Sequence, residues 1–187
     1  MEMDEVKQTD ETDNGNERIR AVYDWVSAAV FSLVCVTIVF ACFFRIVGVD
    51  GASMMDTLYH QDRLILTRWA YTPQRGDIVV INRYTEEPLV KRIIAVGGDT
   101  IYIDPETYAV YLNGEKLEEP YVHYNTLPYD MIEALTIPEG CVFVMGDHRD
   151  NSKDSRSAEI GFVDERDIMG KAIFRLWPLQ RFGGLYD

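Results

Sequence analysis

The residues best suited to chemistry in this sequence are a serine and a lysine in two separate stretches. Ser53 lies in the stretch 49–58, which follows a long apolar segment, and Lys91 lies in the apolar stretch 88–96. Burial disfavours the ammonium form and can lower a lysine pKa by about 3–5 units from its ordinary value of about 10.4. A neutral lysine amine is a general base that can take the proton of a serine hydroxyl. The pair would therefore suit nucleophilic catalysis by Ser53, with Lys91 as the general base.

Ser53 and Lys91 also have a purely structural interpretation. Serines are frequent in turns, and a lysine on an edge strand can extend its amine into water. Side chains alternate along a strand, so Lys91 shares a face with Leu89 and Ile93 while Arg92 lies on the other face, and both faces are apolar. One of the two bases must therefore point at a core or a lined cleft, where only a lysine can lose its proton. From these residues alone the structural interpretation is favoured.

A third segment adds polar groups that could support such a site. Residues 146–156 contain three acids, three lysines or arginines and two hydroxyls, directly after the apolar run 141–145. Charge clusters are usually solvated loops, which is the alternative here. A hydroxyl such as that of Ser152 could instead orient the lysine amine, as a third group orients the base in other catalytic triads. The charged residues that could pair to hold this loop against a site are Asp147, Arg149, Asp154 and Arg156.

The elements that must position these residues are predicted to be strands. Short runs rich in β-branched and aromatic residues are separated by turn signals. Asn113-Gly114 favours a hairpin, because both residues tolerate the positive φ of a type I′ turn. No helical pattern alternates with the strands, so we do not expect a parallel doubly wound sheet. We expect a longer loop over 121–135 and a loose tail at 183–185. The predicted strands are 64–66, 78–81, 89–96, 100–103, 108–112, 115–119, 141–145 and 171–177.

An apolar segment near the N-terminus predicts a membrane anchor. Trp25–Phe44 contains twenty residues without a charge, and Arg45 closes it. As a helix it would span about 30 Å, the thickness of the hydrocarbon core of a bilayer. A cleaved signal peptide is the alternative, but its apolar core would be about 7–15 residues long. We therefore predict a retained transmembrane helix over 25–45, followed by a folded domain over 46–187.

The composition restricts the partners and the location of the protein. The net charge of −13 argues against nucleic acid, which needs clustered lysine and arginine. Residues 1–24 hold eight acids and three lysines or arginines without an apolar period, so we predict a disordered tail. Positive charges flank the apolar segment almost equally, but a short tail before it and a large domain after it favour a cytoplasmic N-terminus. The three cysteines and three histidines show no spacing typical of a disulfide framework or a metal site.

Four motifs in order after one apolar helix resemble the bacterial type I signal peptidases, which are membrane-bound serine proteases with a Ser/Lys dyad. Residues 53–58 resemble the nucleophile motif, 75–80 the following block, 90–94 the block with the base, and 146–156 the most diagnostic block. The resemblance covers about residues 25–178, and Gly170-Lys171-Ala172 and Trp177-Pro178 also fit it.

The resemblance implies a mainly β fold of coiled antiparallel sheets, an extracytoplasmic catalytic domain and no cofactor. Ser53 would form an acyl-enzyme and Lys91 would be the base, with their Oγ and Nζ atoms near 3 Å apart. Ser152 would hydrogen-bond the lysine amine, Asp154 and Arg156 would form an ion pair that holds the site, and the Ser53 backbone N–H would bind the oxyanion. Substrates would be exported preproteins with Ala-x-Ala-like sites.

The site is also expected to lie beside lipid. Ser53 follows Phe44 by nine residues, and an extended link of that length reaches at most about 30 Å. We therefore expect Met54, Met55 and nearby apolar side chains to face the membrane.

Several positions depart from the pattern of that family. Asp56 replaces the usual proline, and a carboxylate near Lys91 would favour the ammonium form. Gly51 replaces a serine that in some members completes the oxyanion hole, and losing such a donor elsewhere costs about 10²–10³ in rate. Gly97 replaces a frequent proline, and His148 replaces the usual asparagine. Neither of these last two changes removes a predicted catalytic group.

Two other interpretations remain open. The same Ser/Lys chemistry occurs in self-cleaving repressor-type proteases and in specialised pilin-processing peptidases, but a repressor would carry a DNA-binding domain in place of the apolar segment. A membrane-anchored scaffold on a degenerate protease fold is the third possibility, and Asp56 and Gly51 are the features that support it.

Overall fold

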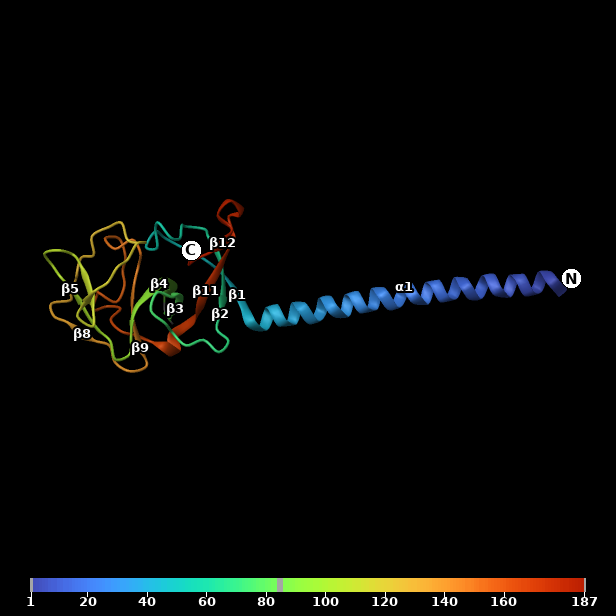
Figure 1. Cartoon of the computed structure of the whole chain (residues 1–187), viewed down its shortest axis with the longest axis horizontal. Helices are drawn as coiled ribbons and strands as arrows, with labels where there is room; N and C mark the ends of the chain where they lie inside the picture. Colours follow the sequence, from blue (N-terminus) through green and yellow to red (C-terminus); the bar gives the residue numbers. More distant parts are fainter. Residues whose placement is uncertain (1, 84–85, 187) are drawn as a thin grey trace. The chain divides into compact units, whose positions relative to one another are not determined.

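The computed structural model describes residues 2–83 and 86–186 of the chain. It divides into Met1–Phe43 and Phe44–Asp187. The first unit contains the helix α1, which runs over Glu2–Phe43 (Figure 1). Its part Arg18–Phe43 is long and apolar enough to cross a membrane. The helix ends two residues before the predicted boundary, because the chain enters strand β1 at Phe44.

The acidic segment 1–24, predicted to be disordered, is helical from Glu2 onward in the structure. Two physical effects explain the difference. Extending an existing helix requires no new nucleation step, and glutamate, lysine, glutamine and arginine are good helix formers.

Phe44–Asp187 contains two antiparallel sheets, which confirms the predicted mainly β fold (Figure 1). In the larger sheet the strand order is β1-β2-β11-β3-β4-β9-β10, and β12 pairs with β11. In the smaller sheet the order is β7-β6-β5-β8. The larger sheet comprises β1 (Phe44–Gly48), β2 (Arg63–Thr67), β3 (Ile78–Arg83), β4 (Glu86–Val96), β9 (Cys141–Met145), β10 (Val163–Asp164), β11 (Ile168–Trp177) and β12 (Gly183–Gly184). The smaller sheet comprises β5 (Thr100–Ile103), β6 (Val110–Leu112), β7 (Glu115–Lys116) and β8 (Leu135–Thr136). Two short 3-10 helices, η1 (Glu165–Asp167) and η2 (Leu179–Arg181), flank β11 of the larger sheet.

The predicted hairpin at Asn113-Gly114 is confirmed. Strands β6 and β7 are antiparallel, with Leu112 opposite Glu115. Asn113 has φ of 54° and Gly114 has φ of 85°, as a tight turn between paired strands requires. The local sequence chemistry was therefore sufficient to locate this turn.

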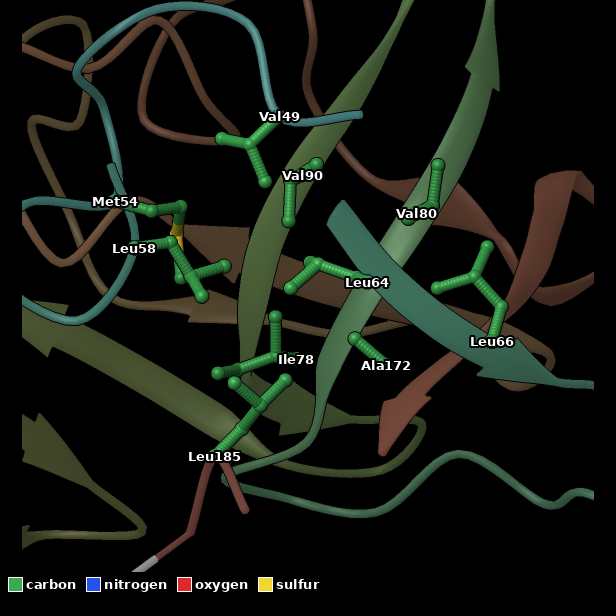
Figure 2. Packing of buried hydrophobic residues seen from close by; sticks show 10 residues of the cluster. All are labelled: Val49, Met54, Leu58, Leu64, Leu66, Ile78, Val80, Val90, Ala172 and Leu185. Atoms are coloured by element: carbon green, nitrogen blue, oxygen red, sulfur yellow. The ribbon is translucent and has the colours of Figure 1, made fainter. Parts of the chain in front are cut away.

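Strand β4 lies in the interior of the domain, between β3 and β9. Val90 belongs to one apolar cluster, which Figure 2 shows with residues from β2, β3 and the segment before β2. Ile94 belongs to a second cluster and Ile93 to a third. Both faces of β4 are therefore covered, so polar side chains at its centre are removed from water.

The C-terminal tail is ordered by pairing, so the prediction of a loose segment at 183–185 is wrong. Gly183 and Gly184 pair with Arg175 and Phe174 of β11. Leu185 is buried in the same apolar cluster as Val90 (Figure 2). Two glycines give no strand signal in the sequence, and this strand forms because a tertiary partner is available.

Candidate active site

The structure brings Ser53 and Lys91 together, although they lie on separate elements. The Lys91 Nζ donates to Ser53 Oγ at 2.5 Å. Lys91 projects from β4 and is only 2% exposed, while Ser53 is half-buried. A serine hydroxyl and a lysine amine at this distance are within reach for direct proton transfer.

Burial lowers the pKa of Lys91 to about 8. The carboxylate of Asp154 opposes this shift, the guanidinium of Arg156 reinforces it, and the carboxylate of Asp147 again opposes it. Among the described residues, no carboxylate forms an ion pair with Lys91. The amine is therefore neutral in about one molecule in ten at pH 7, and a general base acts in this neutral form.

The segment that carries Ser53 is anchored from inside the domain. Met54 and Leu58 are 1% and 0% exposed and pack with Val49 and Val90 (Figure 2). The expectation that Met54 faces the membrane is therefore wrong, because its unbranched side chain fills the core beneath the segment. This packing holds Ser53 over β4, the strand that carries Lys91.

The loop 146–156 contacts the segment of Ser53 directly. The backbone N–H of His148 donates to the Ser53 carbonyl oxygen at 3.1 Å. A Cβ atom at Gly146 would clash with that same carbonyl oxygen and with Ser152 Oγ. Glycine at 146 thus permits the close approach of the loop to Ser53. The Thr57 hydroxyl donates to Asp147 at 2.5 Å and adds a second connection between the two segments.

Buried ion pairs fix the loop 146–156. Asp154 and Arg156 pair at 2.8 Å and are both fully buried. Asp154 also accepts the backbone N–H of Gly146 at 3.0 Å. The expected ion pair between Asp154 and Arg156 is therefore present, in a position where it shapes the turn after β9.

Asp147 and Arg149, the other two residues predicted to pair within the loop, form ion pairs outside it. Arg92 of β4 donates to both oxygens of Asp147, at 2.9 and 2.7 Å. Arg149 pairs with Glu119, and its Nη1 donates to the second oxygen of Glu119 at 2.7 Å. The sequence interpretation kept these pairs within the loop, whereas Arg92 and Glu119 are distant in sequence. The apolar neighbours of Arg92 were the available signal that this residue is buried. Glu119 was placed at the end of the predicted strand 115–119, and nothing there indicated a partner in the loop 146–156.

The comparisons with known proteins identify the family. A sequence model described as "Signal peptidase, peptidase S26" matches residues 22–177. The chain belongs to this signal peptidase family. It is 32% identical to a signal peptidase I of Bacillus licheniformis over 170 residues, which cover 84% of this chain and 90% of the relative. It is 31% identical to a signal peptidase IB of Staphylococcus aureus (strain COL) over 182 residues, which cover 87% and 93% of the two chains.

A solved structure gives a further similarity. The crystal structure of a signal peptidase I from Enterococcus faecalis V583 is similar over 54% of this chain and 97% of the other, with 30% identity and a TM-score of 0.44. Signal peptidases act on preproteins that carry signal peptides. With its N-terminal apolar helix, this chain is a membrane-anchored member of the peptidase family.

Two supporting roles predicted from the signal peptidase motifs, those of Ser152 and of the Ser53 backbone N–H, stay predictions. Ser152 Oγ is buried and has no hydrogen-bond partner within the described residues. Its predicted bond to the Lys91 amine is thus not formed in this structure, and its orienting role stays a prediction. The Ser53 backbone N–H also stays a prediction as the oxyanion donor.

The family departures near Ser53 have little effect on Lys91 itself. Asp56 is exposed and is not among the groups that shift the pKa of Lys91. The carboxylates that do so are those of Asp154 and Asp147. At Gly51 the space that a side chain would enter is open, with no neighbouring atom within 4 Å of a Cβ placed there.

In the described part of the chain, no group of three or more His, Cys, Asp or Glu residues could hold a metal ion.

Proposed function

We propose that this chain removes N-terminal signal peptides from exported preproteins, with Ser53 as the nucleophile and Lys91 as the general base. The observation that carries the proposal is the 2.5 Å contact between Lys91 Nζ and Ser53 Oγ in a buried environment. The membership of the chain in the signal peptidase family supports it. The mechanism below follows from the chemistry of these two groups.

In the first half of the reaction, neutral Lys91 accepts the proton of Ser53 as Oγ attacks the carbonyl carbon of the scissile bond. The negative charge that develops on the carbonyl oxygen is bound by the Ser53 backbone N–H. Protonated Lys91 then gives its proton to the leaving amine, and the acyl-enzyme on Ser53 remains. Because the pKa of Lys91 is lowered to about 8, roughly one molecule in ten holds the neutral amine at pH 7.

In the second half, a water molecule replaces the amine. Lys91, neutral again, takes a proton from the water, and the resulting hydroxide attacks the ester carbon. The Ser53 oxygen leaves and recovers its proton from Lys91. Hydrolysis thus uses the same base twice, with no added cofactor.

The substrate class and the orientation in the membrane follow from the family resemblance. We propose cleavage after Ala-x-Ala-like sites, a cytoplasmic N-terminus and an extracytoplasmic catalytic domain over 46–187. The apolar core of a signal peptide precedes the small residues of its cleavage site, so it would hold the cut near the lipid surface. Protease added to intact spheroplasts should digest the domain, and protection of the domain would contradict this orientation.

The test is cleavage of a preprotein with an Ala-x-Ala site by the full-length protein in detergent, beside Ser53→Ala and Lys91→Ala. We expect the parent to cut at that site and both variants to be inactive while they retain the thermal unfolding transition of the parent. A parent that leaves several such preproteins intact would contradict the proposal and favour the scaffold interpretation. Cleavage by either variant at the parent rate would remove that residue from the mechanism.

A further inference from the structure

His148 contacts the peptide groups on both sides of Ser53. Its backbone N–H donates to the Ser53 carbonyl oxygen at 3.1 Å. Its ring Nδ1 lies 3.2 Å from the Ala52 carbonyl oxygen. A carbonyl oxygen only accepts hydrogen bonds, so the ring must carry its proton on Nδ1 and donate it to Ala52. The nucleophile is thus held from two directions by a residue that is not its sequence neighbour.

The ring of His148 is itself fixed by two neighbours. Its Nε2 lies 3.1 Å from Asp150 Oδ1, which also only accepts, so both contacts are hydrogen bonds when the ring carries a proton on each nitrogen. Its face stacks on Tyr124, with ring centroids 4.0 Å apart and an angle of 24° between the planes. The side chain is only 16% exposed. A ring held at its edge and its face has little freedom, so the Nδ1 proton points at Ala52 in a defined direction.

The Ala52 carbonyl and the Ser53 N–H are the two ends of one planar peptide group. A hydrogen bond to the carbonyl fixes the plane of this group and polarises it, so the N–H at the other end becomes a better aimed and stronger donor. The Ser53 N–H is the donor that the proposed mechanism assigns to the oxyanion. Gly51 has no side chain that could add a second donor, so catalysis depends more heavily on the orientation of this peptide group.

We propose that His148 is a positioning residue whose Nδ1–H orients the Ala52–Ser53 peptide group for binding the oxyanion. The inference rests on the proposed function, because it concerns the same acylation of Ser53. His148 does not touch the reacting atoms and acts through the backbone of Ala52 and Ser53. Its effect is therefore confined to the stabilisation of charge in the transition state, with little effect on substrate affinity.

The matched test compares His148→Asn with His148→Leu. The two side chains have similar size, and both lose the ring, but Asn Nδ2 is bonded to Cγ as His Nδ1 is and can donate to Ala52. A third variant, His148→Phe, keeps a ring to stack on Tyr124 and has no donor. The backbone N–H that binds the Ser53 carbonyl remains in all three variants, so the comparison isolates the side-chain donor.

We expect His148→Leu and His148→Phe to lower kcat by about tenfold with KM changed less than about twofold, since misaiming a donor costs less than the 10²–10³ of removing one. His148→Asn should stay within about threefold of the parent. A peptide aldehyde provides a second measurement, because Ser53 Oγ adds to its carbon, the serine proton passes to Lys91, and the former carbonyl oxygen occupies the oxyanion position. Its affinity should fall in the Leu and Phe variants by the same factor as kcat, while binding of an uncleaved peptide stays unchanged.

Unchanged kcat in both the Leu and Phe variants would overturn the inference. Equal losses in the Asn and Leu variants, with full activity in the Phe variant, would assign His148 a packing role and overturn it as well. Thermal unfolding shows which of the variants are folded. One folded variant without a side-chain donor, either His148→Leu or His148→Phe, is enough for the comparison with His148→Asn. A failure of the proposed function gives a different result, because the parent would then cut no better than Ser53→Ala. If only the His148 inference is wrong, the parent is active and the His148 variants do not differ as expected.

Discussion

Lys91 and Arg92 are neighbours on β4 and are 2% and 5% exposed. As adjacent residues of a regularly paired strand they point to opposite faces, and their surroundings differ. Arg92 donates to both oxygens of Asp147 and to the carbonyl of Gly76, and its guanidinium lies 3.9 Å from the centre of the Tyr121 ring. Lys91 instead meets the hydroxyl of Ser53. The two adjacent residues are thus buried to a similar extent, but only Arg92 of the two is bound to a carboxylate among the described residues, that of Asp147.

Side-chain type and pairing together determine the charge of each residue, because a guanidinium keeps its proton in a protein and a buried lysine amine can lose it. Burial alone would lower the pKa of the Arg92 guanidinium, but the hydrogen bonds and charge of Asp147 raise it. For Lys91 burial outweighs the more distant carboxylates, and the pKa falls to about 8. Arg92 is thus a permanent cation that holds the loop 146–156, and Lys91 is a base that can lose its proton. The comparison teaches that side-chain type and pairing, and not burial alone, separate a permanent structural cation from an amine that can lose its proton.

The largest effect is expected from making position 91 resemble position 92. Lys91→Arg should lower preprotein cleavage by at least about 10⁴-fold, because a guanidinium keeps its proton in a protein. Lys91→Met removes the base without adding a buried charge and should be as inactive. Steady-state cleavage assays measure both losses, and appreciable activity of the folded Met variant would show that another group is the base.

The next effect concerns stability at position 92. Arg92→Met should lower the free energy of unfolding by about 3–5 kcal/mol, because it leaves the Asp147 carboxylate buried without its cation. The double variant Arg92→Met/Asp147→Leu should recover most of this loss, since no unpaired charge remains. Urea unfolding of the domain with its anchor in detergent measures the cycle. Additive losses in the double variant would mean that the two residues are not energetically coupled.

Lys91→Met should have the opposite effect on stability, with a gain of about 1–3 kcal/mol at pH 7. The folded pKa of Lys91 is about 8 and its ordinary value is 10.5. Between these values the unfolded state binds a proton that the native state does not, so the stability of the parent rises with pH. The advantage of the Met variant should therefore be full below pH 8 and shrink as the pH rises toward 10.5. A constant difference across this range would contradict a lowered pKa for Lys91.

The smallest effect is expected at Asp56. Because Asp56 is exposed and does not act on the pKa of Lys91, Asp56→Asn should leave the midpoint of the pH–rate profile within about 0.3 units of the parent. The sequence alone had suggested an influence of this carboxylate on Lys91. A clear shift of the midpoint to lower pH would restore that suggestion and weaken the role given to burial.

Local patterns predicted much of the fold. The runs 100–103 and 141–145 match β5 and β9, because β-branched residues between turn signals define a strand without reference to its partner. Strand β12 and the helical acidic segment were missed, because the first depends on pairing with β11 and the second on continuation of an adjacent helix.

The site was predictable mainly through its motif. Alternation along β4 indicated that Lys91 or Arg92 is buried, but the structure buries both, since each face of β4 is covered. The contact between Lys91 and Ser53 has no local signal and was expected only from the resemblance. The partners of Asp147 and Arg149 were missed because ion pairs between distant elements leave no spacing to detect. The ring contact of His148 with Ala52 was missed for the same reason.

The most direct test of the central claim is the pH dependence of the reaction between Ser53 and a small acylating ester, followed by mass spectrometry of the Ser53 peptide. The reaction of Ser53→Ala provides the background. The account predicts a rate that rises with a single ionisation, is half-maximal near pH 8 and is absent in Lys91→Met. A rate that does not change with pH, a midpoint near the ordinary lysine value of about 10.4, or parent-like labelling of Lys91→Met would contradict it.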